Sequence, residues 1–97
     1  MLNLSQVIGF DWDAGNSFKS VDKHSVPQTE AEQVFADDRS LIVEDVKHSQ
    51  NEVRYQALGR TLDGRLLHVT FTLRENGKKI RVISARDMNR KERGLYE

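Results

Sequence analysis

The sequence has no cysteine, one proline and no long apolar run among its 97 residues. Without cysteine it forms no disulfide or thiolate metal site, which suits a reducing compartment. No stretch approaches the roughly 20 apolar residues of a membrane span, and residues 1–10 lack the order of a signal peptide. We expect a cytoplasmic protein without membrane contact, folded as one domain over residues 1–97 because so short a chain supports one modest core.

Histidine is also sparse, since only His24, His48 and His68 occur. These positions lack the close spacing that is typical of zinc ligands. We therefore expect neither a metal site nor a cofactor.

The formal net charge is zero, but the charges are segregated along the chain. Residues 1–53 contain four Lys or Arg and ten Asp or Glu, whereas residues 54–97 contain eleven and five, giving −6 and +6. If the basic part folds onto one face, it forms a surface that attracts phosphate. The alternative is that the two parts simply pair with each other.

The first third of the chain predicts a short strand followed by two helices. Residues 6–11 suit a strand, and Asp13 is the N-cap of a helix that ends before Pro27, because the residue preceding proline avoids the α region. The second helix is expected at about 29–37, where Thr29 and Glu32 form a capping-box pattern.

The rest of the chain predicts an antiparallel meander. Residues 41–43 suit a strand, and 44–51 an exposed loop. Asp63-Gly64 and Asn76-Gly77 both favour two-residue type I′ turns. The numbers of facing residues then sum to 127 in the first hairpin and to 153 in the second, unless a β-bulge shifts them.

This register separates an apolar face from a polar one. The apolar face, expected to pack against the two helices, carries Leu58, Leu67, Val69, Phe71, Leu73, Ile80, Val82 and Ser84. The polar face carries Tyr55, His68, Thr70, Thr72, Arg74 and Arg81, with Ile83 and Ala85 beside them. A short helix at about 89–96 completes the order strand, two helices, strand, three-strand meander, helix. The fold class is therefore α+β with an antiparallel sheet.

Five short motifs occur in a distinctive order. They are Phe10-Asp11-Trp12-Asp13, Lys23-His24, Asp45-x-x-His48-x-x-x-Glu52-x-Arg54, Phe71-Thr72-Leu73-Arg74 and Ser84-Ala85-Arg86. In this order and spacing the chain resembles the BrnT family of bacterial toxins over roughly residues 8–97. The resemblance implies a RelE-like fold, ribonuclease activity and neutralisation by a BrnA-type ribbon-helix-helix antitoxin. It also implies that operator DNA is bound only through the antitoxin.

Cleaving RNA without a metal requires a base for the 2′-hydroxyl, cations for the phosphorane charge and an acid for the leaving oxygen. Arginine suits the second role, because its guanidinium meets phosphate oxygens with paired donors. We predict catalytic roles for Arg81 and for the motif residues Arg74 and Arg86. The alternatives are a supporting cross-strand row for Arg81, and for Arg86 a helix cap or an ion pair with Asp87 or Glu92.

The remaining candidates lie in loops and at strand ends. His48 and Glu52 are predicted as acid–base groups, although such a pair in a polar loop is often only solvated. Tyr55, Thr72 and Arg81 are predicted to form a row that holds a nucleotide, with a base stacked on Tyr55. The residues predicted to contact RNA are Lys23, His24, Arg54, Tyr55, Thr72 and Arg90. Lys23-His24 also suits a helix C-terminus, where cations favour the dipole.

Some positions look structural or depart from the family pattern. Trp12 is expected to be buried at a sheet–helix junction, and Asp13 to cap a helix. His68 is expected to have no functional role. Ser25 stands where the family usually has glycine, and Asn16 where lysine is common.

These observations favour a metal-independent endoribonuclease toxin that cleaves RNA by 2′-hydroxyl attack. The alternative is a non-catalytic basic domain that binds an acidic partner protein.

Overall fold

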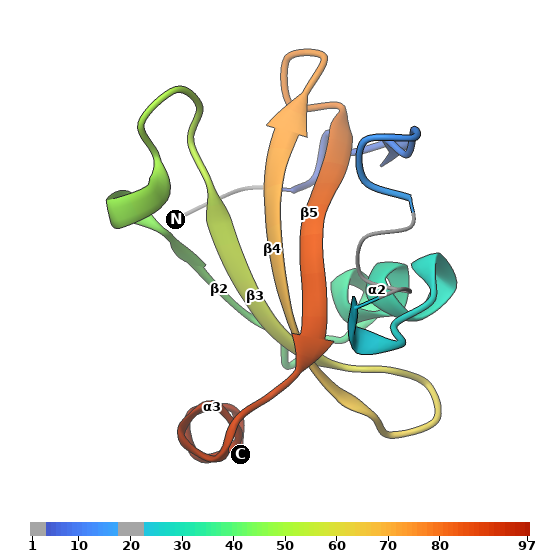
Figure 1. The fold of residues 1–97 in the computed structure, drawn as a ribbon, viewed down its shortest axis with the longest axis vertical. Helices are drawn as coiled ribbons and strands as arrows, with labels where there is room; N and C mark the ends of the chain where they lie inside the picture. The colour runs from blue at the N-terminus through green and yellow to red at the C-terminus, as the bar shows by residue number, and fades with distance from the viewer. Residues whose placement is uncertain (1–3, 18–22) are drawn as a thin grey trace.

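A computed structural model of the protein describes residues 4–17 and 23–97. Its strands form one sheet in the order β1-β5-β4-β3-β2 (Figure 1). They are β1 (Gly9–Phe10), β2 (Leu41–Glu44), β3 (Tyr55–Arg60), β4 (Leu66–Arg74) and β5 (Lys79–Asp87). The strands β2 to β5 pair antiparallel, whereas β1 runs parallel to β5. The expected α+β class is confirmed, but the sheet is mixed rather than antiparallel throughout.

The helices lie at different places around this sheet. Helix α2 (Gln28–Gln33) continues into the 3₁₀ turn η1 (Val34–Ala36) and lies on one side of the sheet (Figure 1). A second 3₁₀ turn, η2 (Val46–His48), follows β2. Helix α3 (Arg90–Tyr96) lies beyond the end of β5. Asn89 and Glu92 form a capping box at its start, which satisfies amide groups that a helix N-terminus leaves free.

The capping box predicted at Thr29 and Glu32 is wrong. The N-cap of α2 is Pro27, which makes no side-chain cap bond, and the Glu32 carboxylate instead accepts a hydrogen bond of 2.8 Å from the indole Nε1 of Trp12. Glu32 therefore links α2 to the segment after β1, a tertiary use that local spacing does not reveal.

The helix predicted from Asp13 is described only at its two ends, and at the second of these Lys23 and His24 are helical. The Asp13 carboxylate accepts a hydrogen bond of 2.7 Å from the Gly15 amide, as an N-cap does, and residues 14–17 form a turn. Residues 18–22, which include Lys19, lie outside the described residues. Asn16 is buried and donates to the carbonyls of Asp11 and Val82. It therefore ties this turn to β5.

The first hairpin differs from its prediction by one residue. Facing residues of β3 and β4 sum to 126 rather than 127, as in Ala57 opposite Val69. The amides of Thr61 and Gly64 donate to Arg65 and Thr61 respectively, and Gly64 has φ +91°. This geometry fits a three-residue loop that ends in a left-handed glycine, which is another common hairpin connection.

The second hairpin follows its prediction until a bulge interrupts it. Asn76 and Gly77 have φ +58° and +87°, as a type I′ turn requires, and facing residues sum to 153 from Arg74 to Phe71. A register shift between Thr70 and Phe71 then raises the sum to 154. The one extra residue on β5 moves the side chains that follow it in this strand to the face opposite the predicted one.

These two shifts correct the predicted faces. Tyr55 lies opposite Phe71 on the apolar face, and its ring stacks on that of Phe71 at a centroid distance of 5.4 Å. Leu58 pairs with His68 on the polar face. Ser84 pairs with Thr70 there, so that the fully buried Ala85 takes the apolar side.

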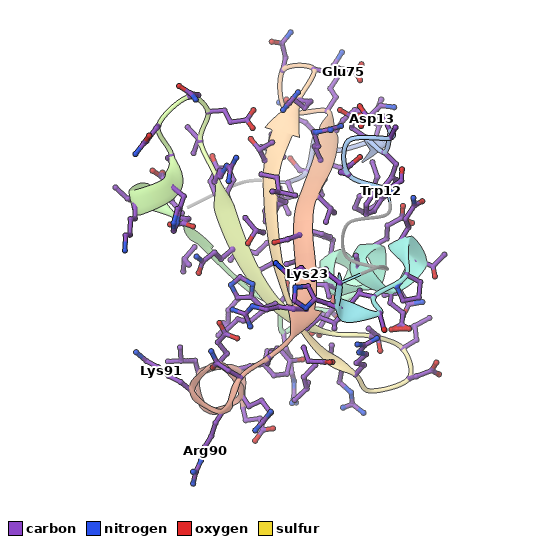
Figure 2. All side chains as sticks on the ribbon, viewed as in Figure 1. Trp12, Asp13, Lys23, Glu75, Arg90 and Lys91 are labelled. Carbon is purple, nitrogen blue, oxygen red and sulfur yellow. The ribbon has the colours of Figure 1, made fainter. Side chains whose placement is uncertain are left out.

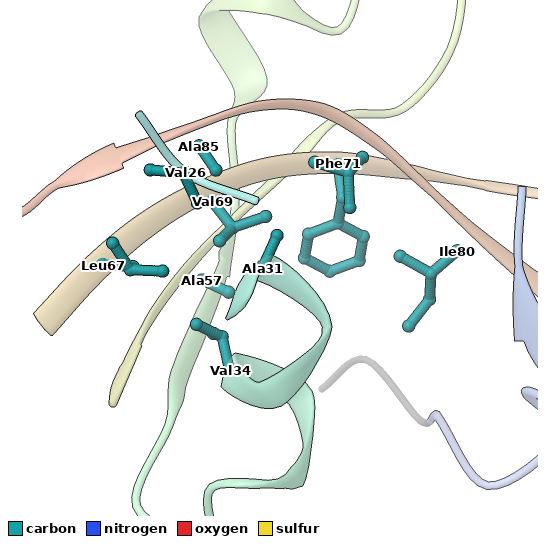
Figure 3. Close-up of a cluster of buried hydrophobic side chains, with 10 residues drawn as sticks. Val26, Ala31, Val34, Ala57, Leu67, Val69, Phe71, Ile80 and Ala85 are labelled. Atoms are coloured by element: carbon teal, nitrogen blue, oxygen red, sulfur yellow. The ribbon is translucent and has the colours of Figure 1, made fainter. Parts of the chain in front are cut away.

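We call the apolar side the closed face, because α2 and η1 pack on it (Figure 3). The ring of Phe71 meets that of Phe35 edge-on at 4.9 Å. Gly59 is needed here, since a Cβ at this position would lie 2.6 Å from the side chain of Val34. The buried cluster consists of Val26, Ala31, Val34, Ala57, Leu67, Val69, Phe71, Ile80, Val82 and Ala85. We call the opposite, more polar side the open face.

Candidate functional site

The predicted catalytic arginines all project from the open face. Ile80 and Val82 are in the core, and Ala85 is buried, so the residues between or beside them, Arg81 and Arg86, face the other way. Arg74 follows Leu73, which packs on the core. Arg81 and Arg86 are five positions apart on β5, which places their backbones about 16 Å apart. The arginines therefore form two groups rather than one cluster.

Arg81 is held by acidic groups from the segment after β1. Its two terminal nitrogens donate to the two carboxylate oxygens of Asp13 at 3.0 and 2.9 Å, and Asp11 lies at 3.5 Å. The Arg81 side chain is only 16% exposed. The hydrogen bond from Arg81 lowers the pKa of Asp13. Asp13, expected to be only a helix cap, therefore also orients this arginine.

Arg74 lies next to this group. It forms an ion pair of 3.0 Å with Glu52, and its charge also helps to lower the pKa of Asp13. Thr72 lies opposite Arg81 as predicted, but its hydroxyl is buried and donates to the Val53 carbonyl at 2.7 Å. The Thr72 side chain therefore holds the segment that leads into β3. The row predicted to hold a nucleotide lacks Tyr55, which lies on the closed face.

Arg86 belongs to a second group beneath α3. Both of its terminal nitrogens bind the Glu92 carboxylate, at 2.7 and 2.8 Å. This pairing lowers the pKa of Glu92 to about 2. The ion-pair alternative considered for Arg86 therefore describes its contact in this structure. A guanidinium oriented by a bidentate carboxylate presents the same donor geometry that phosphate requires.

His68 is part of the same group, although the sequence suggested that it is incidental. It pairs with Arg86 across the strands, is 6% exposed, and its Nε2 lies 3.8 Å from the Glu92 carboxylate. Burial and the positive charge of Arg86 lower the pKa of His68 and favour the neutral imidazole. Its Nδ1 is buried without a hydrogen-bond partner among the described residues. Asn89 and Glu92 carry a capping-box spacing that indicates this helix start, but no sequence pattern places His68 beneath it.

His48 and Glu52 face one hollow but do not pair with each other. This hollow of about 320 Å³ is lined by both residues and by Arg54. His48, with a 60% exposed side chain, instead contacts the carboxylate of Asp45 at 2.9 Å. Although burial acts in the opposite direction, hydrogen bonds from His48 and Gln56 lower the pKa of Asp45. The carboxylate that accompanies the imidazole is therefore Asp45.

Lys23 and His24 lie near the carboxyl end of β5. Arg65 donates to the carbonyls of His24 and Ser25 and binds Asp87 at 2.7 Å. Ser25, where the family usually has glycine, has φ +55°. Figure 2 shows Lys23 beside the lower half of β5, while Arg90 and Lys91 extend from α3. These cations lie at the carboxyl end of β5 and on α3, nearer to the second arginine group than to the first.

The described residues provide neither a metal cluster nor a membrane-spanning helix. Among residues 4–17 and 23–97, no three His, Asp or Glu side chains are grouped so as to hold a metal ion. In the same part of the chain no helix is long and apolar enough to cross a membrane.

Comparison with known proteins assigns the chain to a family. Residues 12–92 match the family described as the ribonuclease toxin, BrnT, of type II toxin–antitoxin systems. No curated protein matches the sequence. The match begins at Trp12 and ends at Glu92, and so includes the segment of Asp13 and the paired Arg86 and Glu92. This protein therefore belongs to the BrnT family of ribonuclease toxins of type II toxin–antitoxin systems.

Proposed function

We propose that this protein is a metal-independent endoribonuclease that binds RNA along the open face and cleaves it by attack of a 2′-hydroxyl. The observation that carries the proposal is that Arg74, Arg81 and Arg86 share this face in a member of a ribonuclease toxin family. The products would be a 5′-hydroxyl and a cyclic phosphate or a 3′-phosphate. Metal independence rests on the absence of cysteine and the scattered histidines.

In this mechanism a phosphate replaces a carboxylate on an arginine. Asp13 and Glu92 each hold a guanidinium through two hydrogen bonds, and a phosphate presents two oxygens in the same way. The displaced carboxylate then lies near the bound phosphate, where it is placed to accept or relay a proton. The positive guanidinium stabilises the charge that develops on the phosphorane.

Regulation would follow from the same surface. We propose that a BrnA-type ribbon-helix-helix antitoxin covers the basic open face or α3, and that operator DNA is bound only through this partner. A neighbouring small reading frame with a ribbon-helix-helix pattern would support this pairing. The other candidate, a non-catalytic domain for an acidic protein, is favoured by the ion pairs that already occupy these arginines.

Cleavage of labelled RNA by the purified protein in EDTA separates these candidates. The wild type should cleave, and Arg81→Ala and Arg74→Ala should each reduce the rate at least ~10-fold, as the loss of one transition-state donor does. Arg39→Ala, which removes an exposed cation before β2, is the matched control and should cleave normally. Activity that appears only after a divalent metal is added would contradict metal independence, and full activity of both variants would contradict the arginine roles.

A further inference from the structure

A hollow beside α3 on the open face is lined mainly by apolar side chains and contains none of the candidate arginines. It lies between β2, the paired ends of β3 and β4, and α3, and has a volume of about 390 Å³. Its walls are the aliphatic side chains of Leu41, Val43, Leu58 and Leu95. Three of these are unusually exposed, at 42% for Leu41, 59% for Val43 and 62% for Leu95. We call it the α3 hollow.

The floor of the α3 hollow is polar. His68 lines it, and this residue is more than nine-tenths buried with an Nδ1 that has no hydrogen-bond partner in the described part of the chain. The neutral imidazole has one donor and one acceptor nitrogen. Gln56 is also in the lining, and its amide nitrogen donates to Asp45. Aliphatic walls over a polar floor suit an occupant with apolar faces and a polar edge.

The rim of the hollow is cationic. Lys91 lines it, is exposed, and has no ion-pair partner among residues 4–17 and 23–97. Glu92 also lines it, but Arg86 neutralises this carboxylate. The occupant should therefore carry negative charge close to its planar part.

We propose that the α3 hollow binds one nucleobase of the RNA, with its faces against the leucines, its edge on His68 and its phosphate near Lys91. This inference rests on the proposed function, because it supplies the position at which that ribonuclease would distinguish bases. Extruded bases are recognised by hydrogen bonds to their edges and by packing of their faces between aromatic or apolar side chains. Arg86 lies opposite His68, so the base is held next to an arginine of the proposed phosphate site.

An apolar anchor from a protein partner fits the hollow less well. It would cover the leucines but would leave the imidazole of His68 buried and unpaired, which carries a desolvation cost. A nucleobase gives that imidazole a partner after a small outward shift of α3. Inorganic phosphate alone uses only the rim.

Direct binding tests this inference without relying on cleavage. The full-length protein is titrated with adenosine, guanosine, cytidine and uridine 3′-monophosphates, and with inorganic phosphate, while NMR follows the His68 ring and the leucine methyl groups. At least one nucleotide should shift these signals, and phosphate should not. Shifts that phosphate reproduces in full, or shifts that leave His68 and the leucines unmoved, would overturn the proposal.

Filling the hollow provides the matched pair of variants. Leu41→Trp and, separately, Val43→Trp place an indole where the base would lie and should weaken nucleotide binding about 10-fold, the scale on which a hydrophobic pocket discriminates. Leu62→Trp is the control, because Leu62 is 85% exposed in the first hairpin loop and lies outside the lining. Equal affinity in all three variants would contradict the pocket.

RNA cleavage by the same variants separates this inference from the proposed function. A wild type that binds a nucleotide at His68 but cleaves no RNA would refute the function and leave the pocket standing. If the wild type cleaves with a base preference, Leu41→Trp should lose that preference while Leu62→Trp keeps it. If Leu41→Trp loses only antitoxin binding and no nucleotide shifts His68, the α3 hollow is a protein-docking surface and the nucleobase proposal is wrong.

Discussion

Side chains of β4 and β5 point either to the closed face or to the open face, and the two faces differ in what holds these side chains. On the closed face Val69 and Phe71 are fully buried beneath α2 and η1. On the open face Arg81 and Arg86 are each held by a carboxylate from a distant or following segment. The closed face excludes water through contact, whereas the open face orients charges. The difference places stability mainly on the closed face, and the open face is the one that we propose to bind RNA.

The largest expected effect tests the stabilising role of the closed face. Phe71→Ala should reduce the free energy of unfolding by about 3–5 kcal/mol, because it leaves a cavity between Phe35 and Tyr55. Thr70→Ala, the neighbouring change on the open face, should cost less than about 1 kcal/mol. Urea denaturation monitored by circular dichroism measures both. Similar losses would show that the two faces do not differ in this way.

A smaller effect, a gain in the free energy of unfolding, is expected at Ser25, near the closed face. Ser25 has φ +55°, a conformation that is unfavourable for residues with a Cβ. Ser25→Gly should therefore raise the free energy of unfolding by about 0.5–1 kcal/mol, less than the full strain because glycine also adds entropy to the unfolded chain. Ser25→Ala is the control and should give no gain. If both variants have the same melting temperature, the strain at this position is negligible.

The smallest effect concerns pH and the open face. The pKa of His68 is lowered by burial and by Arg86, while the charges of Glu92 and Asp45 oppose the shift. The unfolded chain therefore takes up a proton on His68 at a higher pH than the folded protein does. The free energy of unfolding should fall as pH drops below about 6.5 and level off below the folded pKa.

The variant His68→Gln isolates this contribution. It should flatten the pH dependence of stability just below pH 6.5, as followed by urea denaturation at a series of pH values. The carboxylates act at lower pH, since the pKa of Glu92 is about 2 and its stabilisation is lost only as pH falls from about 4.5 towards that value. An unchanged slope in the variant would contradict the assignment to His68.

The two hairpins show how far local signals reach. Asn76-Gly77 set the second turn correctly, because both central residues of a type I′ turn need positive φ. Asp63-Gly64 carried the same signal, but the hydrogen bonds of Thr61 and Arg65 give a longer loop with only Gly64 left-handed among its residues. Since side chains alternate along a strand, this single residue was enough to move Tyr55 and Leu58 to the opposite faces.

The candidate site was also predicted only in part from the sequence. The order of the motifs is sufficient to identify the family, and the turn at Asn76-Gly77 correctly predicts Arg81 opposite Thr72. The catalytic roles of the arginines stay predictions. The sequence did not indicate that Asp13 binds Arg81 across 68 positions, or that His68 lies beneath α3. No periodicity or spacing links residues so far apart, because their contact depends on how β1 pairs with β5 and where α3 lies relative to the sheet.

By itself the sequence determined the family, the α+β class, the turn at Asn76-Gly77 and the arginine-rich character of the C-terminal part. These follow from residue types and short spacings, which act within a few residues. Only the tertiary structure decided the bulge at Thr70/Phe71, the carboxylate that holds each arginine and the α3 hollow. Each of these depends on the position of one strand or helix against another, where packing and charge over long separations outweigh local preference.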